Sequence, residues 1–414
     1  MKEKTYSLLR KIEKYTKTDM VYLASGGFWL FLKTAISAVV AFTISVAFAN
    51  LLPKTTYGEY KYIFSMFGLL AIPTLTGMGT AATKSVAQGF EGTPSAALRT
   101  KIRWGLLGSA ASASIAVYYA VQGNLELAGA FLLVMFFLPF VDTLSIYNSV
   151  LTGKKLFRIS TIYEIIVQFI SAIAIITALF LTNSLLIVLA VYFITFTIVR
   201  FFIFRAVIKR HTENPSVDKE TTKYGKHLSV MDILSTVSDA LDSILLWQFV
   251  GPAPVAVYAF AKGIPVQVSV AMQRIMTLAF PKFAQRDFQT IRSSLVHKML
   301  LMFLVMLIVV ILYILAAPYI FQLFFPAYTE AIIYSQIFSL TLLFFPQKFI
   351  GTAFQAHART KSLYVFTTIT PIVRMGLAFS LIPFFGIIGA IATELIGRAV
   401  NFCILTMLML RAKT

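Results

Sequence analysis

The sequence predicts an all-α integral membrane protein with about 12 transmembrane helices. Hydrophobic residues make up 58% of the 414 residues and charged residues only 13%, with a mean hydropathy of +0.81. A soluble domain would be about a quarter charged. Apolar stretches of about 20 residues, the length needed to cross a bilayer core, recur along the whole chain. Basic residues gather between these stretches, as they do in the loops of polytopic membrane proteins.

The expected spans are apolar runs bounded by charged or turn-forming residues. The segment before the first span is too rich in Lys and Arg for a removable signal peptide. The spans cover approximately residues 21–49, 60–84, 104–122, 127–151, 159–182, 184–205, 228–250, 255–280, 298–317, 330–355, 363–383 and 387–410.

The distribution of Lys and Arg predicts the orientation of the chain. Of the 36 basic residues, 26 fall in the termini and connections of one side, whereas only Lys54 lies in a connection of the other side. Basic loops stay on the cytoplasmic side, so both termini are expected in the cytoplasm. The same asymmetry explains the formal net charge of +19 without a nucleic-acid partner.

Two similar halves are visible in the pattern of hairpins and turns. "LPKTTYGEY" (52–60) and "VGPAPVAVY" (250–258) each join an odd-numbered span to the next, and "GKKLF" (153–157) and "RTKSLY" (359–364) form basic turns. This repeat predicts two parallel six-helix lobes around a central cavity, the arrangement of many transporters. The expected parts are a basic tail (1–20), an N-lobe (21–205), a basic linker (206–227), a C-lobe (228–410) and a short C-terminus (411–414).

The hairpin motifs resemble those of a known family. "VGPAPVAVY" is similar to the LGP-x-x-x-G-x-Y hairpin of bacterial polysaccharide flippases, including those that move lipid-linked O-antigen units. The first copy keeps Tyr57, Gly58 and Tyr60 but has Pro53 where a glycine is usual. "LIPFFGIIGAIAT" (381–393) resembles the family's hairpin between the eleventh and twelfth spans.

Membership of this family, within the multidrug/oligosaccharidyl-lipid/polysaccharide exporter superfamily, would imply a non-enzymatic flippase of the inner membrane. Its cavity would be cationic and open alternately to each side. The implied substrate is a polyprenyl pyrophosphate that carries an oligosaccharide. The implied partners are membrane lipid, a polysaccharide polymerase and a chain-length regulator, with no nucleic acid. No cofactor or metal is expected, and H⁺ or Na⁺ would drive the cycle.

Basic residues inside spans are the candidate ligands of the pyrophosphate, because a cation that faced lipid would cost roughly 3 kcal/mol. Lys262 follows Tyr258 by four residues, where related peptidoglycan-precursor flippases carry a basic residue. Lys61 lies near the corresponding place in the first half but three residues out of register. The other candidates rest on their depth in a span, and each could instead pair with a buried acid: Lys33, Arg274, Arg374 and Arg398.

Acidic residues inside spans are expected to balance these cations or to bind the driving ion. Asp239 and Asp242 share a helical face with Asp232, which should be solvated because it is nearer the inner surface. Glu394 precedes Arg398 by four residues, a spacing that favours an ion pair on one helix. Asp142 in the fourth span is as consistent with a structural role as with a functional one.

Glycine and proline residues mark possible bends. Pro73, Gly77 and Gly79 interrupt the second span, and Gly263 and Pro265 interrupt the eighth. Such positions serve either as hinges for alternating access or as ordinary close packing of membrane helices.

Two other functions fit a basic polytopic protein. A polysaccharide polymerase or ligase would typically carry a large outer loop with basic residues and histidines, but the longest expected outer connection (318–329) has neither. A cation-coupled multidrug exporter of the same superfamily would favour acids over a surplus of buried lysines. The four histidines are not at metal-ligand spacing.

Overall fold

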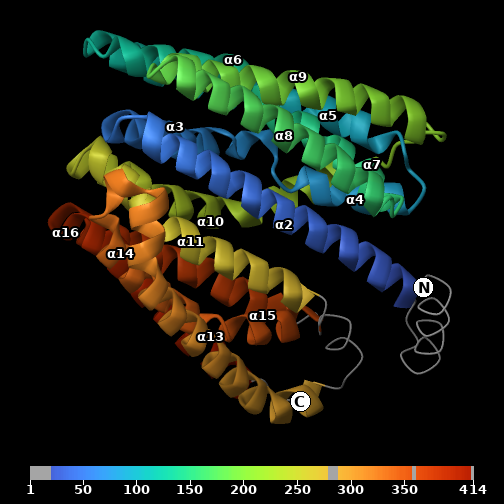
Figure 1. The fold of residues 1–414 in the computed structure, drawn as a ribbon. Coiled ribbons are helices and arrows are strands. Elements are labelled where there is room, and N and C mark those ends of the chain that lie inside the picture. The colour runs from blue at the N-terminus through green and yellow to red at the C-terminus, as the bar shows by residue number, and fades with distance from the viewer. Residues whose placement is uncertain (1–19, 278–287, 357–359, 412–414) are drawn as a thin grey trace, which may run out of the picture.

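The computed structural model describes residues 20–277, 288–356 and 360–411, which form helices and no strand. The N-lobe comprises α2 (Met20–Leu51), α3 (Lys54–Leu70), η1 (Ile72–Thr74), α4 (Met78–Ala87), α5 (Thr93–Val121), α6 (Leu125–Val141), η2 (Thr143–Ile146), α7 (Tyr147–Gly153), α8 (Phe157–Leu181) and α9 (Leu185–His211). The C-lobe comprises α10 (Thr221–Phe249), α11 (Pro252–Thr277), α13 (Phe288–Phe324), η3 (Pro326–Tyr328), α14 (Ala331–Ser339), η4 (Leu340–Phe344), α15 (Gln347–Ala356) and α16 (Thr360–Arg411). Figure 1 shows the helices of the two lobes side by side.

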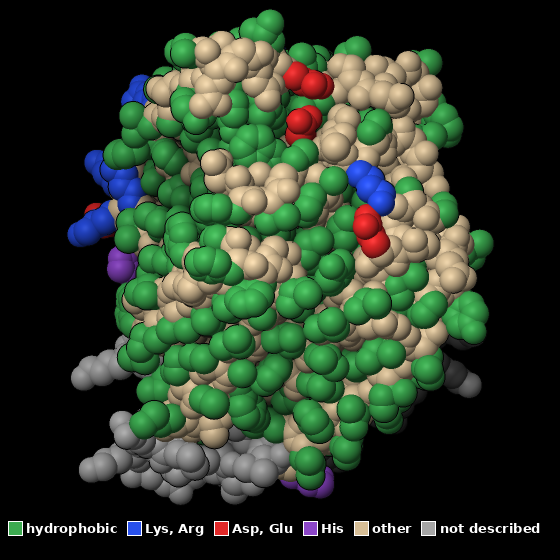
Figure 2. All heavy atoms as spheres, turned by 90° about the vertical axis from the view of Figure 1, so that its left-hand side faces the viewer, with side chains coloured by type: hydrophobic (Ala, Val, Ile, Leu, Met, Phe, Trp, Pro, Cys, Tyr) green, Lys and Arg blue, Asp and Glu red, His purple; other side chains and the backbone are tan. Residues whose placement is uncertain are grey.

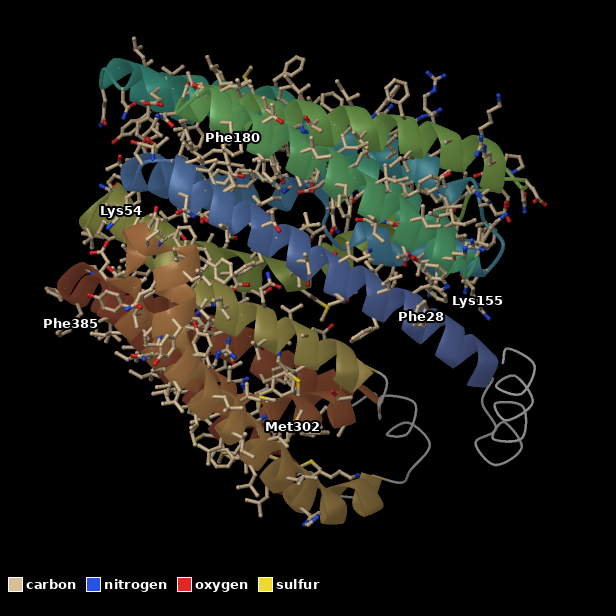
Figure 3. The ribbon with its side chains drawn as sticks, viewed as in Figure 1. Phe28, Lys54, Lys155, Phe180, Met302 and Phe385 are labelled. Carbon is tan, nitrogen blue, oxygen red and sulfur yellow. The ribbon has the colours of Figure 1, made fainter. Side chains whose placement is uncertain are left out.

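The helices confirm a multi-pass membrane protein. Among the described residues, 8 helices are long and apolar enough to cross a membrane, or up to 10 if each of two bent pairs forms one span. The helix α10 is too polar to be counted among them. The last two expected spans form one helix, α16, which is kinked at Gly386 (φ 54). The count of 12 therefore stays a prediction. Phe28 and Phe180 point away from the helices, as side chains that face lipid would (Figure 3).

The fourth span of each half contains a 3₁₀ turn, although only the C-lobe span is sharply bent there, by 42°. A 3₁₀ turn separates α6 from α7 in the N-lobe, and η4 separates α14 from α15 in the C-lobe. Pro139 lies in α6 and Pro346 directly precedes α15, and proline disrupts helical hydrogen bonding because it lacks an N–H. The repeated 3₁₀ turn supports the expected relationship between the halves.

Of the two spans in which the sequence marks possible bends, only the second is bent. The second span bends by 46° between α3 and α4, around the turn that contains Pro73. In the eighth span α11 runs without interruption through Gly263 and Pro265. A proline can be accommodated within a helix when the helix curves or its neighbours satisfy the freed carbonyl.

The two ends of the molecule differ in character. We call the end that carries Lys54 and the kink at Gly386 the hairpin end, and the end that carries Lys155 the basic end (Figure 3). Figure 2 looks onto the hairpin end, where hydrophobic and uncharged side chains predominate. The first described helix, α2, begins at the basic end (Figure 1).

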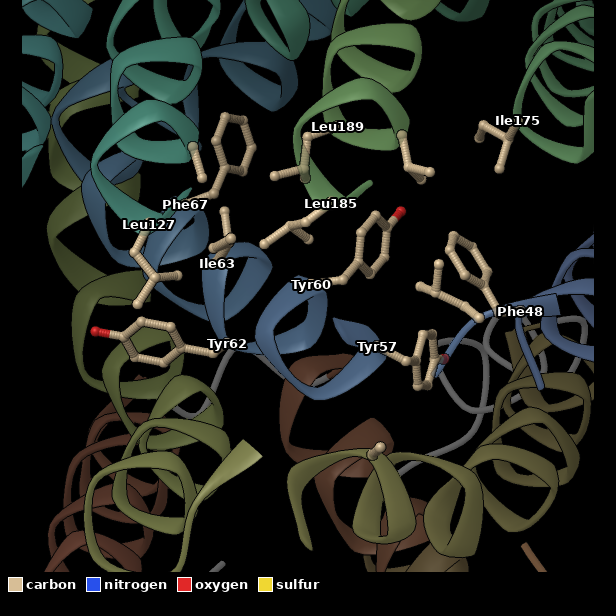
Figure 4. Close-up of a cluster of buried hydrophobic side chains, with 14 of the residues drawn as sticks. Phe48, Tyr57, Tyr60, Tyr62, Ile63, Phe67, Leu127, Ile175, Leu185 and Leu189 are labelled. Carbon is tan, nitrogen blue, oxygen red and sulfur yellow. The ribbon is translucent and has the colours of Figure 1, made fainter. Parts of the chain in front are cut away.

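The lobes meet at the hairpin end through aromatic rings and close backbone contact. Tyr57 of α3 is buried in the core shown in Figure 4, and its ring stacks on Phe260 of α11 at 4.9 Å between centroids. Tyr62 stacks on Trp247 of α10 at 4.2 Å. A Cβ at Gly58 would lie 1.8 Å from the carbonyl oxygen of Pro252, so only glycine lets α3 and α11 approach this closely.

At the basic end, α10 crosses from the C-lobe to the N-lobe. Its Ser229 hydroxyl accepts a hydrogen bond from the N–H of Gly77 (3.0 Å). In the preceding linker, the Asp218 carboxylate accepts bonds from Ser85 (2.7 Å) and Thr221 (2.8 Å). These hydrogen bonds hold the pKa of Asp218 below its ordinary value. At the basic end α10 is therefore hydrogen-bonded to the N-lobe, and along its length it also packs with α16.

Candidate substrate site between the lobes

Arg374 is the centre of an ion-pair network inside the C-lobe. Its guanidinium lies 2.5 Å from Asp239, 2.7 Å from Asp242 and 3.0 Å from Glu394. Glu394 also pairs with Arg398 at 3.0 Å. α10 supplies the two aspartates, and the two arms of α16 supply the arginines and the glutamate. The network thus joins predicted residues from the seventh, eleventh and twelfth spans.

The acids of this network differ in exposure. The Asp242 side chain is only 1% exposed and also accepts a hydrogen bond from the Tyr258 hydroxyl (2.8 Å). The Asp239 side chain is 72% exposed, although we expected only Asp232 of this helical face to be solvated. Paired carboxylates tolerate burial because their partners replace the lost hydration. All three acids are therefore matched by arginine.

The two central lysines, in contrast, have no acidic partner within ion-pair distance. The amine of Lys262 lies over the Tyr258 ring, 4.6 Å from its centroid, and that of Lys61 lies over the Tyr57 ring at 5.2 Å. Among the described residues, neither makes an ion pair or a side-chain hydrogen bond. The two lysines come from α3 and α11, which pack against each other. Lys262 is near enough to interact electrostatically with Asp242, Arg374 and Glu394 and, more weakly, with Lys61. Cations placed together in this way suit an anionic ligand.

The ring contacts offer a second way to match Lys61 with Lys262. In each half a lysine follows a buried tyrosine by four residues and covers its ring, as Tyr57 with Lys61 and Tyr258 with Lys262. Positions four apart share one helix face, so the pairs are equivalent when Tyr57 rather than Tyr60 is matched to Tyr258. The repeated Tyr-x-x-x-Lys spacing is the sequence signal that would have found this.

Lys348 is a further cation that the sequence marked as lying within a span but did not single out as a ligand. It lies on α15 and is exposed, near enough to Asp239, Glu394 and Arg398 to interact electrostatically with them. Among the described residues, its amine has no ion-pair partner. It therefore extends the set of unpaired lysines along the C-lobe side.

The remaining predicted residues lie apart from this cluster. Lys33 is half-buried on α2 and makes no ion pair with a described residue. The side chain of Arg274 lies outside the part of the chain that the structure describes. Asp232 is exposed and accepts a 3.4 Å hydrogen bond from Thr76. Asp142 pairs with Arg200 of α9 at 3.2 Å, which supports its structural interpretation.

Comparison with known proteins places the chain in a family. A family model described as "Polysaccharide biosynthesis protein" matches residues 23–287. The chain belongs to this polysaccharide biosynthesis family. The resemblance inferred from the hairpin motifs is thereby confirmed. The chain matches none of the curated protein sequences.

Solved transporters share the fold of this family member. A multidrug resistance MATE family transporter of the MOP superfamily in an inward-facing conformation aligns with a TM-score of 0.68 at 15% identity, covering 90% of this chain and 94% of the transporter. The outward-facing conformation of such a transporter gives 0.60 at 15% identity over 94% of each chain. The lipid II flippase MurJ, in an inward closed conformation, gives 0.65 at 16% identity, covering 91% of this chain and 87% of MurJ.

Proposed function

We propose that this protein is a flippase for lipid-linked oligosaccharides. It would carry polyprenyl-pyrophosphate-linked repeat units, of O-antigen or a related surface polysaccharide, from the cytoplasmic to the outer face of the inner membrane. Alternating access between the two lobes would move the sugar and pyrophosphate, while the lipid tail stays in the bilayer. Family membership and the MurJ-like fold support this function.

The proposal rests on a difference in pairing among the described residues at the centre of the molecule: the arginines form ion pairs with acids, whereas the lysines do not. Asp239, Asp242 and Glu394 are matched by Arg374 and Arg398. Among the described residues, Lys61 and Lys262 then remain without an ion-pair partner where the lobes meet. A pyrophosphate would supply the missing negative charge and replace part of its own hydration with ammonium groups.

The same charge distribution disfavours the alternatives. A multidrug exporter for cationic compounds would need acids free to bind them, whereas the C-lobe acids are occupied by arginines. A polymerase or ligase would need reactive groups on a substantial outer loop. Instead, α13 continues to Phe324 and only the short η3 separates it from α14. The absence of an enzymatic activity remains part of the proposal.

We place the basic end in the cytoplasm and interpret the conformation as inward-facing. The excess of Lys and Arg at that end supports the orientation. The higher TM-score with an inward-facing transporter than with an outward-facing one supports the conformation. One oxygen of Asp242, Oδ1, is buried without a hydrogen-bond partner among the described residues. A driving H⁺ or Na⁺ would bind there.

The test is the location and length of lipid-linked glycan in cells that lack this protein. Accumulation of single repeat units on the cytoplasmic face would support a flippase. Single units that reach the outer face and stay unpolymerised would identify a polymerase instead.

Complementation of these cells tests the lysines. We expect Lys61→Met and Lys262→Met each to reduce export at least tenfold, because the pyrophosphate loses a charged partner. Lys54→Met is the matched control, since Lys54 pairs with Glu330 at the exposed hairpin end. Equal export by all three variants would contradict the assigned role of the lysines.

A further inference from the structure

A polar pocket lies in the N-lobe toward the basic end, apart from the ion-pair network. It has a volume of about 320 Å³, at the lower end of the range for small-molecule sites. α4, α5, η2 and α7 line it, and Thr76 at its edge contacts Asp232 of α10. The pocket therefore borders the interface between the lobes.

Lys101 of α5 is the charged group of this pocket. The residue is only 6% exposed, and its amine makes a single hydrogen bond to a described residue, a long one of 3.5 Å to the carbonyl oxygen of Leu75. A lysine ammonium has three N–H donors. A buried ammonium with so little protein contact requires acceptors from a bound molecule or from water.

The hydroxyl groups of the pocket offer both acceptors and donors. Thr83 and Ser149 each donate to the carbonyl oxygen of Gly79 at 2.9 Å, and Ser145 donates to that of Asp142 at 2.6 Å. Their protons are occupied, so their oxygen lone pairs remain as acceptors. Thr80 and Thr152 make no side-chain hydrogen bond to other described residues and are available as donors.

This mixture of groups selects one ligand chemistry over another. The pyrophosphate of a lipid-linked glycan is esterified at both ends, so it accepts hydrogen bonds and donates none, and it would meet several acceptor oxygens in the pocket. A sugar hydroxyl both donates and accepts hydrogen bonds. It could therefore donate to the three hydroxyl oxygens whose protons are already used and accept from the ammonium of Lys101. Among the described residues that line the pocket none is aromatic, so recognition here would depend on hydrogen bonds.

We propose that this pocket binds a sugar ring of the transported glycan; this inference rests on the proposed flippase function. Thr76 and Lys61 lie 15 residues apart on the second span, roughly 20 Å along a helix. A glycan whose pyrophosphate contacts Lys61 and Lys262 would therefore place a sugar several rings from the lipid in the pocket. The pocket would contribute to selection of the glycan, separately from the lysines that hold the pyrophosphate.

Lys101 also has a structural role, which the test must distinguish from a role in ligand binding. Leu75 has a left-handed backbone (φ 61) at the break between α3 and α4, and the ammonium lies beside its carbonyl. Replacement of Lys101 could therefore disturb the bend itself. The hydroxyls of Thr80 and Thr152 are the better targets, since valine keeps their shape and they hold no described group in place.

The experiment measures binding to the purified full-length protein in lipid nanodiscs. One probe is lipid-linked glycan extracted from the membranes of the parent cells, and the other is undecaprenyl diphosphate without sugar. We expect Thr80→Val/Thr152→Val to weaken binding of the lipid-linked glycan about tenfold and to leave binding of undecaprenyl diphosphate unchanged. Lys262→Met should weaken both. Thr100→Val, a hydroxyl on α5 outside the pocket, is the matched control.

The outcomes separate this inference from the proposed function. Equal weakening of both probes by the double variant, or no weakening of either, would overturn the sugar pocket while leaving the flippase intact. Competition by inorganic phosphate that disappears in Lys101→Met would show an anion site and overturn it as well. If the unmodified protein binds neither probe, the flippase function itself is wrong.

Discussion

The two lobes are built on the same helical plan but carry different polar groups. The C-lobe holds three acids and two arginines in one connected network around Arg374. Among its described residues, the N-lobe holds one ion pair within its spans, Arg200 with Asp142, and a hydroxyl-lined pocket with the buried Lys101.

Two halves with the same fold can therefore carry different polar side chains. Ion pairs require fixed geometry and stabilise a particular arrangement of helices, whereas hydroxyls rotate and adapt to neutral polar ligands. The C-lobe is therefore the electrostatically ordered half and the N-lobe the half suited to hydrogen-bond recognition. The paired tyrosines and lysines on α3 and α11 are what the halves have in common.

The largest expected effect comes from breaking the C-lobe network. Arg374→Met would leave Asp242 buried without its cation, and we expect the free energy of unfolding to fall by about 3–5 kcal/mol. Arg200→Met is the matched variant in the N-lobe. Because the Asp142 side chain is 56% exposed, we expect Arg200→Met to lower the free energy of unfolding by a smaller amount, about 1–2 kcal/mol.

Denaturation of both variants in detergent micelles would check this difference. Equal losses of stability would show that the two lobes depend on their ion pairs to the same extent. The electrostatic distinction between the lobes would then be wrong.

A smaller effect is expected where the lobes touch at the hairpin end. Gly58→Ala would place a Cβ 1.8 Å from the carbonyl oxygen of Pro252, so α3 and α11 must separate. We expect destabilisation by about 1–3 kcal/mol. In the same helix a Cβ at Gly68 meets nothing within 4 Å, so Gly68→Ala should stabilise by about 0.5–1 kcal/mol. A stabilised Gly58→Ala variant in thermal unfolding would contradict the close contact.

The smallest effect concerns the linker that fastens α10 to the N-lobe. The pKa of Asp218 is lowered by hydrogen bonds from Ser85 and Thr221, so its contribution is present above the ordinary aspartate pKa of about 3.9 and is lost as the pH falls through the lowered value. We expect Asp218→Asn to increase hydrogen exchange of linker amides at pH 7. The unmodified protein should show this increase only under strongly acidic conditions.

Glu220→Gln is the control for this prediction, because Glu220 is an exposed neighbour whose side chain makes no hydrogen bond to a described residue. Unchanged exchange in Asp218→Asn at pH 7 would mean that the linker is held by its other bonds, such as that between Gly92 and Ser216.

Most of the fold could be predicted from the sequence because membrane insertion depends on local composition. Each apolar run long enough to cross the bilayer must satisfy its backbone hydrogen bonds internally and so becomes a helix. The ion pair between Glu394 and Arg398 was equally predictable, since both lie one turn apart on one helix.

Contacts between helices far apart in the sequence were harder to predict. The sequence placed Arg374, Asp239 and Asp242 within spans, but only packing of α10 against α16 brings them together. It also gave no sign that Ser229 of α10, at the basic end, accepts a hydrogen bond from Gly77 of the N-lobe. Lys101 was counted among the basic residues of a connection and was not recognised as buried.

The sequence by itself determined that this chain is a helical membrane protein of two related halves with strongly asymmetric charge. Hydrophobicity, charge and repeat spacing are properties of neighbouring residues, and they act before the helices assemble. The tertiary structure alone decided which charges are neutralised and which remain available. Whether a lysine meets a carboxylate depends on how helices far apart in the sequence pack. Among the described residues, that packing pairs the acids with arginines and leaves Lys61 and Lys262 without an ion-pair partner.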